Sequence, residues 1–368
     1  MSALSARLPD FPWDTIAAAA ERARTHPGGV VDLSVGTPVD PVPALVQDAL
    51  RAASNSPGYP TVLGSAALRG AAVEWFDRRL GVPGLDPATQ VLPTIGSKEL
   101  VAWLPTLLGL GPADTVVVPS LAYPTYAVGG HVVGATVVPT DALTALGPAR
   151  VSLVWVNSPS NPTGRVLPAE HLAKVVSWAR ERGAIVVSDE CYVELGWDAR
   201  PVSVLHPSVC GGSTDGLLAV HSLSKRSNLA GYRAGLVAGD PTLIAELLAV
   251  RKHLGMLVPA PVQAAAAAAL ADDEHVATQR AVYAERRVRL GAALEGAGFR
   301  IDHSEAGLYL WVTRGEPCRE TLAWLAGLGI LVAPGDFYGA AGAEHVRVAL
   351  TATDERVAAA AARLASAS

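Results

Sequence analysis

The stretch "VSLVWVNSPSNPTGRVLPAEHLAKVVSWARERGAIVVSDECY", residues 151–192, alternates two kinds of pattern. Residues 151–156 and 184–188 are short apolar runs rich in β-branched side chains. Between them, 168–183 has the apolar spacing of a helix, with a proline at its start and a glycine at its end. A strand, a helix and a second strand form a β-α-β unit, which builds parallel sheets buried on both faces. The stretch therefore predicts an α/β fold.

The same alternation continues on both sides of this unit, from about residue 90 to residue 240. Further apolar runs lie at 115–119, 135–139, 217–221 and 235–239. Beyond residue 239 long helical segments, one at about 274–297, mix with short strands at 307–312, 330–334 and 345–350. We expect a large domain whose mostly parallel sheet is covered by helices, and a smaller α/β C-terminal domain. The predicted division is an N-terminal arm that forms part of the small domain (1–35), the large domain (36–255) and the small domain (256–368).

The composition is typical of a well-buried globular enzyme. Half of the 368 residues are hydrophobic and 17% are charged, with a formal net charge of −5 and no basic cluster. This balance disfavours nucleic acid as a partner, and no apolar run approaches the ~18 residues that a membrane span needs. The three cysteines have no paired spacing, so we expect neither a disulfide framework nor a metal site, and a cytoplasmic location.

Polar segments follow four of the predicted strands. They are "SLAYPTY" (120–126), "NSPSNPTG" (157–164), "DECY" (189–192) and "SLSK" (222–225). Ligands of open parallel sheets bind outside the carboxyl ends of the strands, so these segments should converge on one crevice. The last segment holds Lys225, one of only four lysines among 29 basic residues. Unlike arginine, a lysine amine can be tuned into a nucleophile that forms an imine.

These residue types suit one ligand, pyridoxal 5′-phosphate. Its aldehyde needs an amine, its ring nitrogen needs a carboxylate that keeps it protonated, and its phosphate needs fixed donors. The converging segments offer a lysine, an aspartate, an asparagine, tyrosines, and a serine with an arginine eight residues beyond the lysine. The sequence therefore predicts a pyridoxal-phosphate site at this edge of the sheet.

Over nearly its whole length, the chain resembles the class I/II aminotransferases of the fold-type I pyridoxal-phosphate-dependent enzymes. The family segment S-x-[ST]-K, with an arginine eight residues later, is matched by Ser222, Lys225 and Arg233. The N-P-x-G turn is matched at 161–164, and the D-x-x-Y motif at 189–192. Each motif alone is a weak signal, whereas the set is specific. The resemblance implies the fold of this family and a transaminase activity.

The resemblance also implies a role for the matched residues around the cofactor ring. Lys225 would bind the cofactor as an imine and act as the general base. Asp189 would pair with the pyridine nitrogen, and Tyr192 and Asn161 would hydrogen-bond the ring hydroxyl. Tyr123 falls where the family stacks an aromatic side chain on the ring face. Lys225, Asp189 and Tyr192 are therefore the expected catalytic residues.

Other matched residues would hold the phosphate and the substrate. The phosphate would be bound by Ser222, Arg233 and the helix N-terminus at Ser97 and Lys98. The expected substrate-binding residues are Gly36, Asn161 and Arg347, of which Arg347 would grip the α-carboxylate. Residues 58–69 match a segment in which a tyrosine, here Tyr59, reaches the phosphate of the neighbouring subunit. The resemblance thus implies a homodimer with shared active sites.

The choice of substrate rests on resemblance alone. Stretches such as "DLSVGTPVDPVP" (32–43) and "APGDFYG" (333–339) look like short actinobacterial-type succinyldiaminopimelate transaminases. Such an enzyme exchanges the amino group of N-succinyl-LL-2,6-diaminopimelate with 2-oxoglutarate, the keto acid of glutamate. This long substrate carries several carboxylates, so a second anion site is expected, for which Arg24, Lys98 and Lys252 are equally open.

Other functions fit the same scaffold. Aspartate or aromatic transamination and cysteine-S-conjugate β-lyase activity remain open, because the cofactor supplies the hard chemistry and the pocket selects the bond that breaks. A non-enzymatic ligand sensor fused to a DNA-binding module is disfavoured. The family match begins by about residue 31, which leaves no room for a helix-turn-helix domain, and the net charge is acidic.

Overall fold

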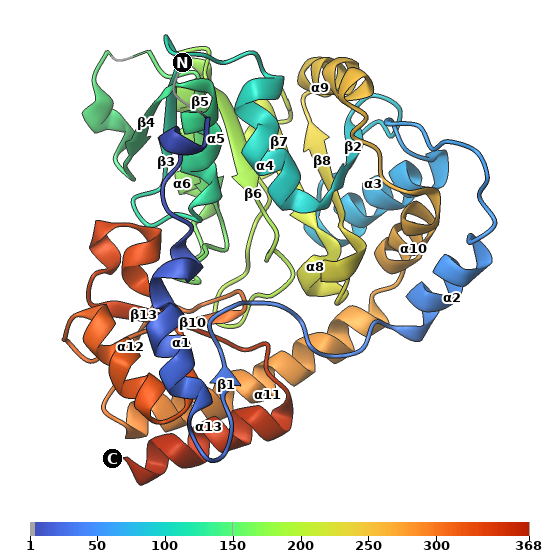
Figure 1. Ribbon diagram of the computed structural model, residues 1–368. Coiled ribbons are helices and arrows are strands. Elements are labelled where there is room, and N and C mark those ends of the chain that lie inside the picture. The colour runs from blue at the N-terminus through green and yellow to red at the C-terminus, as the bar shows by residue number, and fades with distance from the viewer. Residues whose placement is uncertain (1–3, 149, 368) are drawn as a thin grey trace.

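A seven-stranded sheet forms the centre of the larger half of the molecule in the computed structural model, which describes residues 4–148 and 150–367 (Figure 1). Within this part of the chain the strand order is β2-β8-β7-β6-β5-β3-β4. Each apolar run from residue 115 to residue 239 forms one of these strands, which confirms the predicted α/β fold. The strands are β2 (Val91–Ile95), β3 (Thr115–Val118), β4 (Thr136–Pro139), β5 (Leu153–Asn157), β6 (Ile185–Asp189), β7 (Leu217–Ser222) and β8 (Ala234–Gly239).

Most of the sheet is parallel, as the β-α-β pattern predicts. The strands β4, β3, β5, β6 and β7 pair in parallel, whereas β8 is antiparallel to both β7 and β2. If the strand after β7 were to run parallel to it, the connection between them would need a crossover of a dozen or more residues. Only residues 223–233 join β7 to β8, and they contain the short helix α8 (Leu223–Arg226). This connection is too short for a crossover, so the chain turns back.

The sequence patterns do not predict β2, because Pro93 lies in its middle. Proline cannot donate to a neighbouring strand, and it is found mainly on edge strands. The strand β2 is such an edge, since β8 is its only partner within the described residues. The proline therefore does not prevent pairing here.

Helices cover both faces of the large sheet, because its strands are apolar on both sides (Figure 1). Val154 and Val156 of β5 belong to a core with α3, α6 and α10. Leu153 and Trp155 of the same strand belong to a second core, with α4, α5 and α9. This alternation fixes the register of the strand. The helices of this half are α2 (Ala44–Ala52), α3 (Ala66–Leu80), α4 (Gly96–Leu107), α5 (Thr125–Val133), α6 (Ala169–Arg180), α7 (Pro207–Cys210), α8, α9 (Pro241–Leu254) and α10 (Ala260–Ala271).

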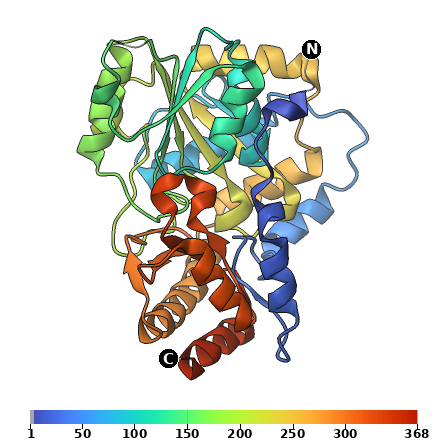
Figure 2. The ribbon, with the colours of Figure 1, turned by 60° about the vertical axis from the view of Figure 1, so that its left-hand side comes forward.

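The smaller half has its own core, made from both ends of the chain (Figures 1 and 2). An antiparallel sheet has the order β12-β13-β10-β9, and β1 pairs in parallel with β11. The strands are β1 (Val31–Asp32), β9 (Arg300–Asp302), β10 (Tyr309–Thr313), β11 (Ile330–Leu331), β12 (Ala333–Pro334) and β13 (His345–Ala349). The helices are α1 (Ala17–Arg24), α11 (Glu274–Gly296), α12 (Cys318–Gly327) and α13 (Asp354–Ser366). Short 3-10 helices lie at Leu4–Arg7, Pro12–Ile16, Leu143–Leu146, Ala230–Tyr232, Gly335–Tyr338 and Ala340–Gly342.

The helix α10 connects the two halves. It packs against α2 and α3, and its alanines belong to the core of the large sheet, although the sequence-based division places residues 256–368 in the small domain. The next helix, α11, packs against α13 in the other core. The predicted domain boundaries stay a proposal. Across the described residues, we find no helix with the length and apolar character of a membrane span.

Candidate active site

Three parallel strands bring their last residues to one edge of the large sheet. They are Asn157 of β5, Asp189 of β6 and Ser222 of β7, and Asn157 is paired in register with Asp189. The side-chain amide of Asn157 donates to the carbonyl of Asp189 at 2.9 Å, and its side-chain oxygen accepts from the backbone N–H of Asn161 at 2.7 Å. The segments that were expected to converge therefore do so, and Asn157 ties two of them together.

Lys225 lies on α8, directly after β7, and its Nζ donates to the carbonyl of Gly36. Burial lowers the pKa of Lys225, and the charges of Arg347 and Arg233 act in the same direction. A lower pKa increases the share of neutral amine, the form that attacks an aldehyde. The surroundings thus suit a nucleophilic lysine.

The neighbouring residue anchors this short helix. Arg226 is only 2% exposed, and its Nε donates to Glu194 in a buried ion pair. One of its Nη atoms also donates to the carbonyl of Ala269 at 2.8 Å. Burial raises the pKa of Glu194, but the adjacent Arg226 charge and hydrogen bonds outweigh it, so that the pKa is lowered. The ion pair therefore stays charged and holds α8 in place.

Asp189 is a buried carboxylate held by neutral donors. Its Oδ2 accepts from the hydroxyl of Tyr126 at 2.7 Å, and its Oδ1 accepts from the backbone N–H of Cys191 at 3.1 Å. Burial raises the pKa of Asp189, against these hydrogen bonds. Within the described residues it has no salt bridge. A buried carboxylate without a cation favours a cationic ligand atom, such as a protonated ring nitrogen.

Arg347 and Asn161 form the second half of the site. Arg347 lies on β13, is 3% exposed, and donates to the Oδ1 of Asn161 at 2.7 Å and to the carbonyl of Ser34 at 2.6 Å. Its Nε has no hydrogen-bond partner, and no described carboxylate forms a salt bridge with it. The nearby tyrosines raise its pKa, against the effect of burial, so the guanidinium stays charged. A buried guanidinium with a free donor is suited to a carboxylate ligand.

Tyr192 lies near Arg347. Its hydroxyl is 3.1 Å from that of Tyr309 on β10, and both side chains are buried. Gly36 passes directly over Tyr309, where a Cβ atom would overlap the tyrosine hydroxyl. Only glycine therefore lets the N-terminal segment approach closely enough for its carbonyl to reach Lys225.

The residues expected at the phosphate lie around the start of α4. Ser222 is buried and donates to the Oγ of Ser224 at 2.9 Å. Arg233 donates to the carbonyl of Ala230 at 3.0 Å, and its guanidinium occupies the space that a side chain at Gly96 would fill. Gly96 has a φ of 67° and opens α4. A guanidinium, serine hydroxyls and a helix N-terminus are groups that suit an anion such as a phosphate.

Two further expected residues border the same space. Tyr123 stands edge-on to Tyr126, with ring centroids 5.7 Å apart, and burial raises its pKa to about 12. The Ser97 side chain interacts with the thiol of Cys191, next to Asp189. The structure thus brings both residues to the edge of the sheet where Asp189 lies.

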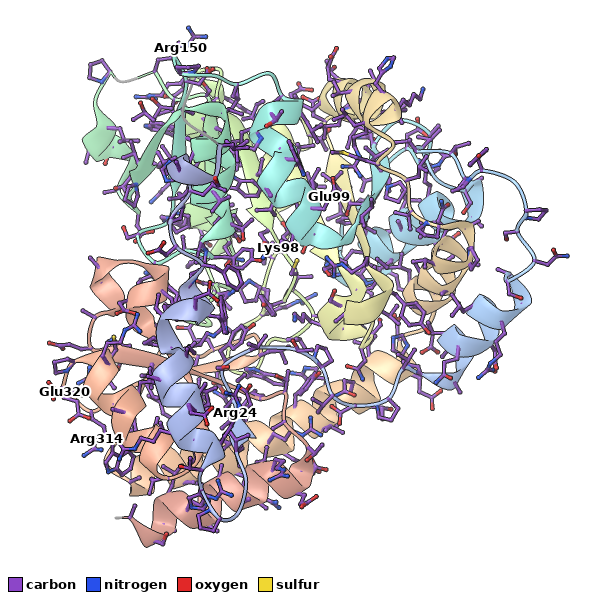
Figure 3. All side chains as sticks on the ribbon, in the orientation of Figure 1. Arg24, Lys98, Glu99, Arg150, Arg314 and Glu320 are labelled. Atoms are coloured by element: carbon purple, nitrogen blue, oxygen red, sulfur yellow. The ribbon has the colours of Figure 1, made fainter. Side chains whose placement is uncertain are left out.

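Four of the expected side chains lie outside the buried network. Figure 3 labels two of them, Arg24 and Lys98. The Lys98 side chain is exposed, with its Nζ 5.8 Å from the ring centre of Phe11. Arg24 is exposed on α1 beside Glu21, and Lys252 is exposed on α9. Tyr59 is 98% exposed, on the loop between α2 and α3. None of these side chains takes part in the buried network.

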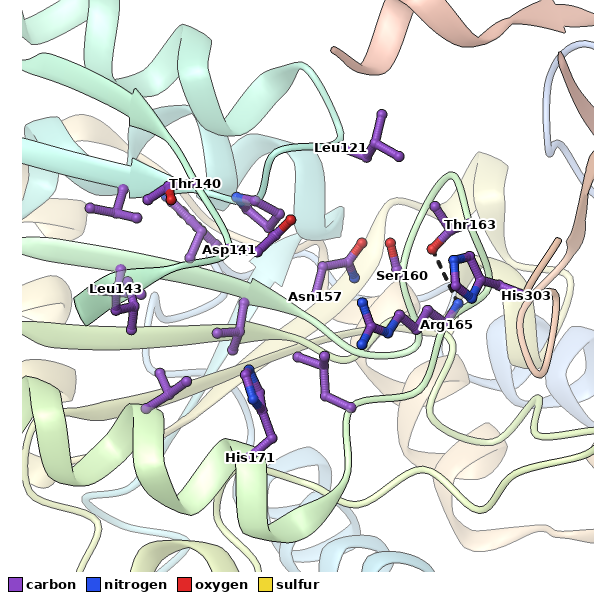
Figure 4. Close-up of a pocket in the computed structure, with 17 residues that line it drawn as sticks. Leu121, Thr140, Asp141, Leu143, Asn157, Ser160, Thr163, Arg165, His171 and His303 are labelled. Atoms are coloured by element: carbon purple, nitrogen blue, oxygen red, sulfur yellow. Dashed lines mark hydrogen bonds between the residues drawn. The ribbon is translucent and has the colours of Figure 1, made fainter. Parts of the chain in front are cut away.

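A separate cavity of about 270 Å³ is bordered by Asn157 (Figure 4). Its lining includes the apolar side chains of Val154, Val156 and Val175, together with Arg165 and other polar groups. Of the predicted cofactor and substrate residues, none lines it. The buried network between the sheet edge and β13, and not this cavity, contains the expected chemistry.

The sequence patterns do not predict two further members of the buried network, Tyr126 and Tyr309. Tyr126 lies three residues after Tyr123, on the first turn of α5, and binds Asp189. Tyr309 is a polar group within the continuous apolar run at 307–312. A hydroxyl in an otherwise apolar strand is the one signal that could have pointed to it, because a buried hydroxyl needs a partner.

The residues fit pyridoxal phosphate by their chemistry. A buried carboxylate without a cation suits the protonated ring nitrogen, the anion site at α4 suits the phosphate, and Lys225 suits the aldehyde. The free donor on Arg347 then remains for a substrate carboxylate.

Comparison with known proteins agrees with this chemistry. The family model for aminotransferase class I and II matches residues 28–364. The chain is 67% identical to a "Probable aminotransferase" of Mycobacterium tuberculosis, over 98% of this chain and 86% of that protein. It is 61% identical to the 4-dedimethylamino-4-oxo-anhydrotetracycline transaminase of Streptomyces rimosus, over 97% and 99% of the two chains.

Two less similar proteins are named as diaminopimelate aminotransferases. The LL-diaminopimelate aminotransferase of Gloeobacter violaceus is 33% identical, over 95% of this chain and 94% of that protein. Among solved structures, a "probable N-succinyldiaminopimelate aminotransferase" from Thermus thermophilus is 29% identical with a TM-score of 0.87, over 97% and 100% of the two chains.

Proposed function

Because the chain belongs to the class I and II aminotransferases, we propose that it transfers the amino group of N-succinyl-LL-2,6-diaminopimelate to 2-oxoglutarate. The family uses pyridoxal phosphate, which supplies the electron sink for breaking bonds at the α-carbon. The observation that carries the use of an amino-acid donor is the buried guanidinium of Arg347, whose Nε has no partner.

The proposed roles of the protein groups are those that the family resemblance implies, and the contacts of these groups support them. Lys225, with its lowered pKa, holds the cofactor and moves a proton to and from the α-carbon. Asp189 keeps the ring nitrogen protonated, and Tyr126 orients that carboxylate. The α-carboxylate of the substrate binds Arg347, and Asn161 orients the guanidinium.

The diaminopimelate substrate is supported by two relatives. The Gloeobacter violaceus protein is named for LL-diaminopimelate, and the Thermus thermophilus structure for its N-succinyl derivative. In our proposal, the distal carboxylates of the substrate bind outside the buried network. Arg24 and Lys252 contribute no side chain to that network, and Lys98 is exposed beside the N-terminal arm.

A second candidate is favoured by the higher identity to the Streptomyces rimosus enzyme. Its name describes a transaminase of a 4-oxo-anhydrotetracycline, a polycyclic ketone. Such an acceptor would be aminated with an amino acid as donor, and the donor carboxylate would use Arg347 in the same way. The two candidates therefore differ in the acceptor and share the buried network.

A half-reaction screen separates the candidates. Purified enzyme loaded with cofactor is mixed with N-succinyl-LL-diaminopimelate, LL-diaminopimelate, aspartate or phenylalanine, and the loss of the cofactor's visible absorption is followed. In the reverse direction, enzyme that carries the aminated cofactor is mixed with 2-oxoglutarate or with the 4-oxo-anhydrotetracycline. We expect kcat/KM of about 10⁴ M⁻¹s⁻¹ or more for the succinylated donor, with 2-oxoglutarate as acceptor.

The other outcomes each identify a different function. Comparable rates with aspartate or phenylalanine contradict the proposal in favour of those transaminases, and release of pyruvate from a cysteine S-conjugate indicates β-lyase activity. Fast amination of the tetracycline ketone, with no reaction of the succinylated donor, establishes the second candidate.

We also propose a homodimer with shared active sites. Tyr59 is nearly fully exposed and makes no side-chain hydrogen bond within the described residues, as expected of a side chain that completes a neighbouring site. Closed two-fold dimers are the commonest assembly of soluble enzymes.

The three free cysteines support a cytoplasmic location.

A further inference from the structure

Tyr309 occupies a central place in the buried network, although it is not among the residues expected to bind the cofactor or the substrate. Its hydroxyl lies 3.1 Å from the hydroxyl of Tyr192. Its ring faces the guanidinium of Arg347, whose central carbon is 3.8 Å from the ring centre. One side chain thus contacts both the proposed partner of the cofactor ring and the proposed partner of the substrate carboxylate.

The backbone around Tyr309 fixes its position. Tyr309 pairs with Ala349 in the antiparallel register of β10 and β13, the strand that carries Arg347. From the other side, Gly36 leaves no room between its Cα and the tyrosine hydroxyl. The side chain is 4% exposed, so water does not compete for the hydroxyl.

Several ionisable groups surround the hydroxyls of Tyr309 and Tyr192, which are hydrogen-bonded to each other. The ionisable groups near Tyr309 include Tyr192 and Cys191 after β6, Lys225 on α8 and Arg347 on β13. Burial alone would raise the pKa of Tyr309, but the charges of Arg347 and Lys225 outweigh it and lower the pKa. Burial raises the pKa of Tyr192 well above its ordinary range. In the proposed arrangement Tyr192 donates its one hydroxyl hydrogen to the cofactor ring oxygen, so the hydrogen bond between the two tyrosines is donated by Tyr309.

We propose that Tyr309 is a positioning residue that donates a hydrogen bond to Tyr192 and, through its ring, holds Arg347 in place. This inference rests on the proposed role of Tyr192 at the cofactor ring oxygen, and not on the identity of the substrate. A tyrosine that accepts a hydrogen bond is a stronger donor, because hydrogen bonds in a chain polarise one another. Tyr309 therefore strengthens the contact that Tyr192 makes with the ring.

The test uses Tyr309→Phe, which keeps the ring over Arg347 and removes only the hydroxyl. A donor to the ring oxygen favours its deprotonated form, so losing Tyr309 support raises the pH midpoint of the cofactor's visible absorption. We expect a rise of about 0.3–1 pH unit without substrate, the size of one lost hydrogen bond. With substrate, KM should change less than about 3-fold, because the ring remains on Arg347.

The matched control is Tyr338→Phe. The ring of Tyr338 also faces Arg347, at 5.0 Å, but its buried hydroxyl has no hydrogen-bond partner. The absorption midpoint of this variant should equal that of wild type. An unchanged midpoint in Tyr309→Phe, or the same shift in both variants, overturns the inference. The titration needs no amino donor, so its result is independent of the substrate proposal.

Discussion

The guanidinium of Arg347 donates a hydrogen bond of 2.7 Å to the side-chain oxygen of Asn161, although the two residues are 186 positions apart in the chain. One belongs to a strand of the smaller half and the other to the turn after β5 of the large sheet. The proposed carboxylate site is therefore made by both halves, and neither half contains it alone.

This pairing leads to a prediction for Arg347→Lys. Lysine keeps the charge, but it cannot bond Asn161 and Ser34 and also present a second donor to a carboxylate. Losing one charge-assisted hydrogen bond should raise KM for the amino donor by roughly 10–100-fold, with a smaller effect on kcat. Steady-state kinetics provide the measurement. Arg314→Lys is the control, since Arg314 packs on Trp324 away from the network; an unchanged KM in Arg347→Lys contradicts the assignment.

A second prediction concerns Lys225→Arg. The variant keeps a positive charge next to Gly36 but cannot bind an aldehyde covalently. Turnover should fall to background, and borohydride treatment should no longer fix the cofactor to the protein. Some cofactor should still bind through Asp189, Ser222 and Arg233. Lys174→Arg, an exposed site on α6, should behave as wild type. Wild-type turnover in Lys225→Arg would falsify its catalytic role.

The third prediction compares the loss of the Asp189 charge with the loss of the Tyr126 hydroxyl that binds this carboxylate. Asp189→Asn keeps the shape and removes the charge that holds the ring nitrogen protonated, so kcat should fall about 10²-fold or more. Tyr126→Phe removes one hydrogen bond of 2.7 Å to that carboxylate, and a loss of roughly 10-fold is expected. Single-turnover rates measure both. If Tyr126→Phe proves the more damaging change, the proposed division of roles is wrong.

The fourth prediction concerns stability and pH. Burial raises the pKa of Glu190 to about 7, from an ordinary value of 4.5, while its Oε1 accepts from Val204 N–H at 2.7 Å. The folded state thus holds this proton more tightly than the unfolded state. The stability that the residue contributes is fully present below about pH 4.5 and is lost as the pH rises through 7.

Glu190→Gln has no proton to lose, so its stability relative to wild type should increase between pH 5 and pH 8, by on the order of 1–3 kcal/mol. Thermal unfolding at several pH values measures the difference. Glu246→Gln, on the exposed face of α9, should show no such trend. Parallel pH profiles for Glu190→Gln and wild type would show that the buried group does not titrate as described.

The fifth prediction tests the shared site with mixed dimers. Tyr59→Phe alone should weaken cofactor binding roughly 10–100-fold, the loss of a charge-assisted hydrogen bond to phosphate. In a heterodimer of Lys225→Ala and Tyr59→Phe chains, sharing across subunits places both lesions in one site and leaves the other intact. At limiting cofactor, activity should approach half that of wild type. Activity no better than half that of the Tyr59→Phe homodimer excludes sharing.

Much of the large sheet could be predicted because its signals are local. The helix 168–183 and the strand runs from 115 to 239 have the periodicity that their burial requires, and the structure confirms them within a few residues. The run 330–334 is different, since it forms two strands in two sheets, separated at Val332. Which partner a strand finds depends on distant residues, and no local pattern contains that information.

The same contrast applies to the site. Lys225, Asp189 and Asn161 stand out because each lies in a polar segment that follows a predicted strand, and the geometry of parallel sheets then places these segments at one edge. The interactions of Tyr309 cannot be derived in this way. They depend on how β10 lies against Gly36 and Arg347, that is, on contacts between segments that are far apart in the sequence.

The pairing of β1 with β11 has a consequence for synthesis on the ribosome. Val31 and Asp32 align with Ile330 and Leu331, so the first of these strands must wait for nearly 300 more residues before its partner is made. The large sheet needs only residues 91–239 for its strands and can begin to form during that interval. The emerging N-terminal segment, with Gly36, therefore stays unpaired until late in translation, and Lys225 is enclosed only when the last part of the chain arrives.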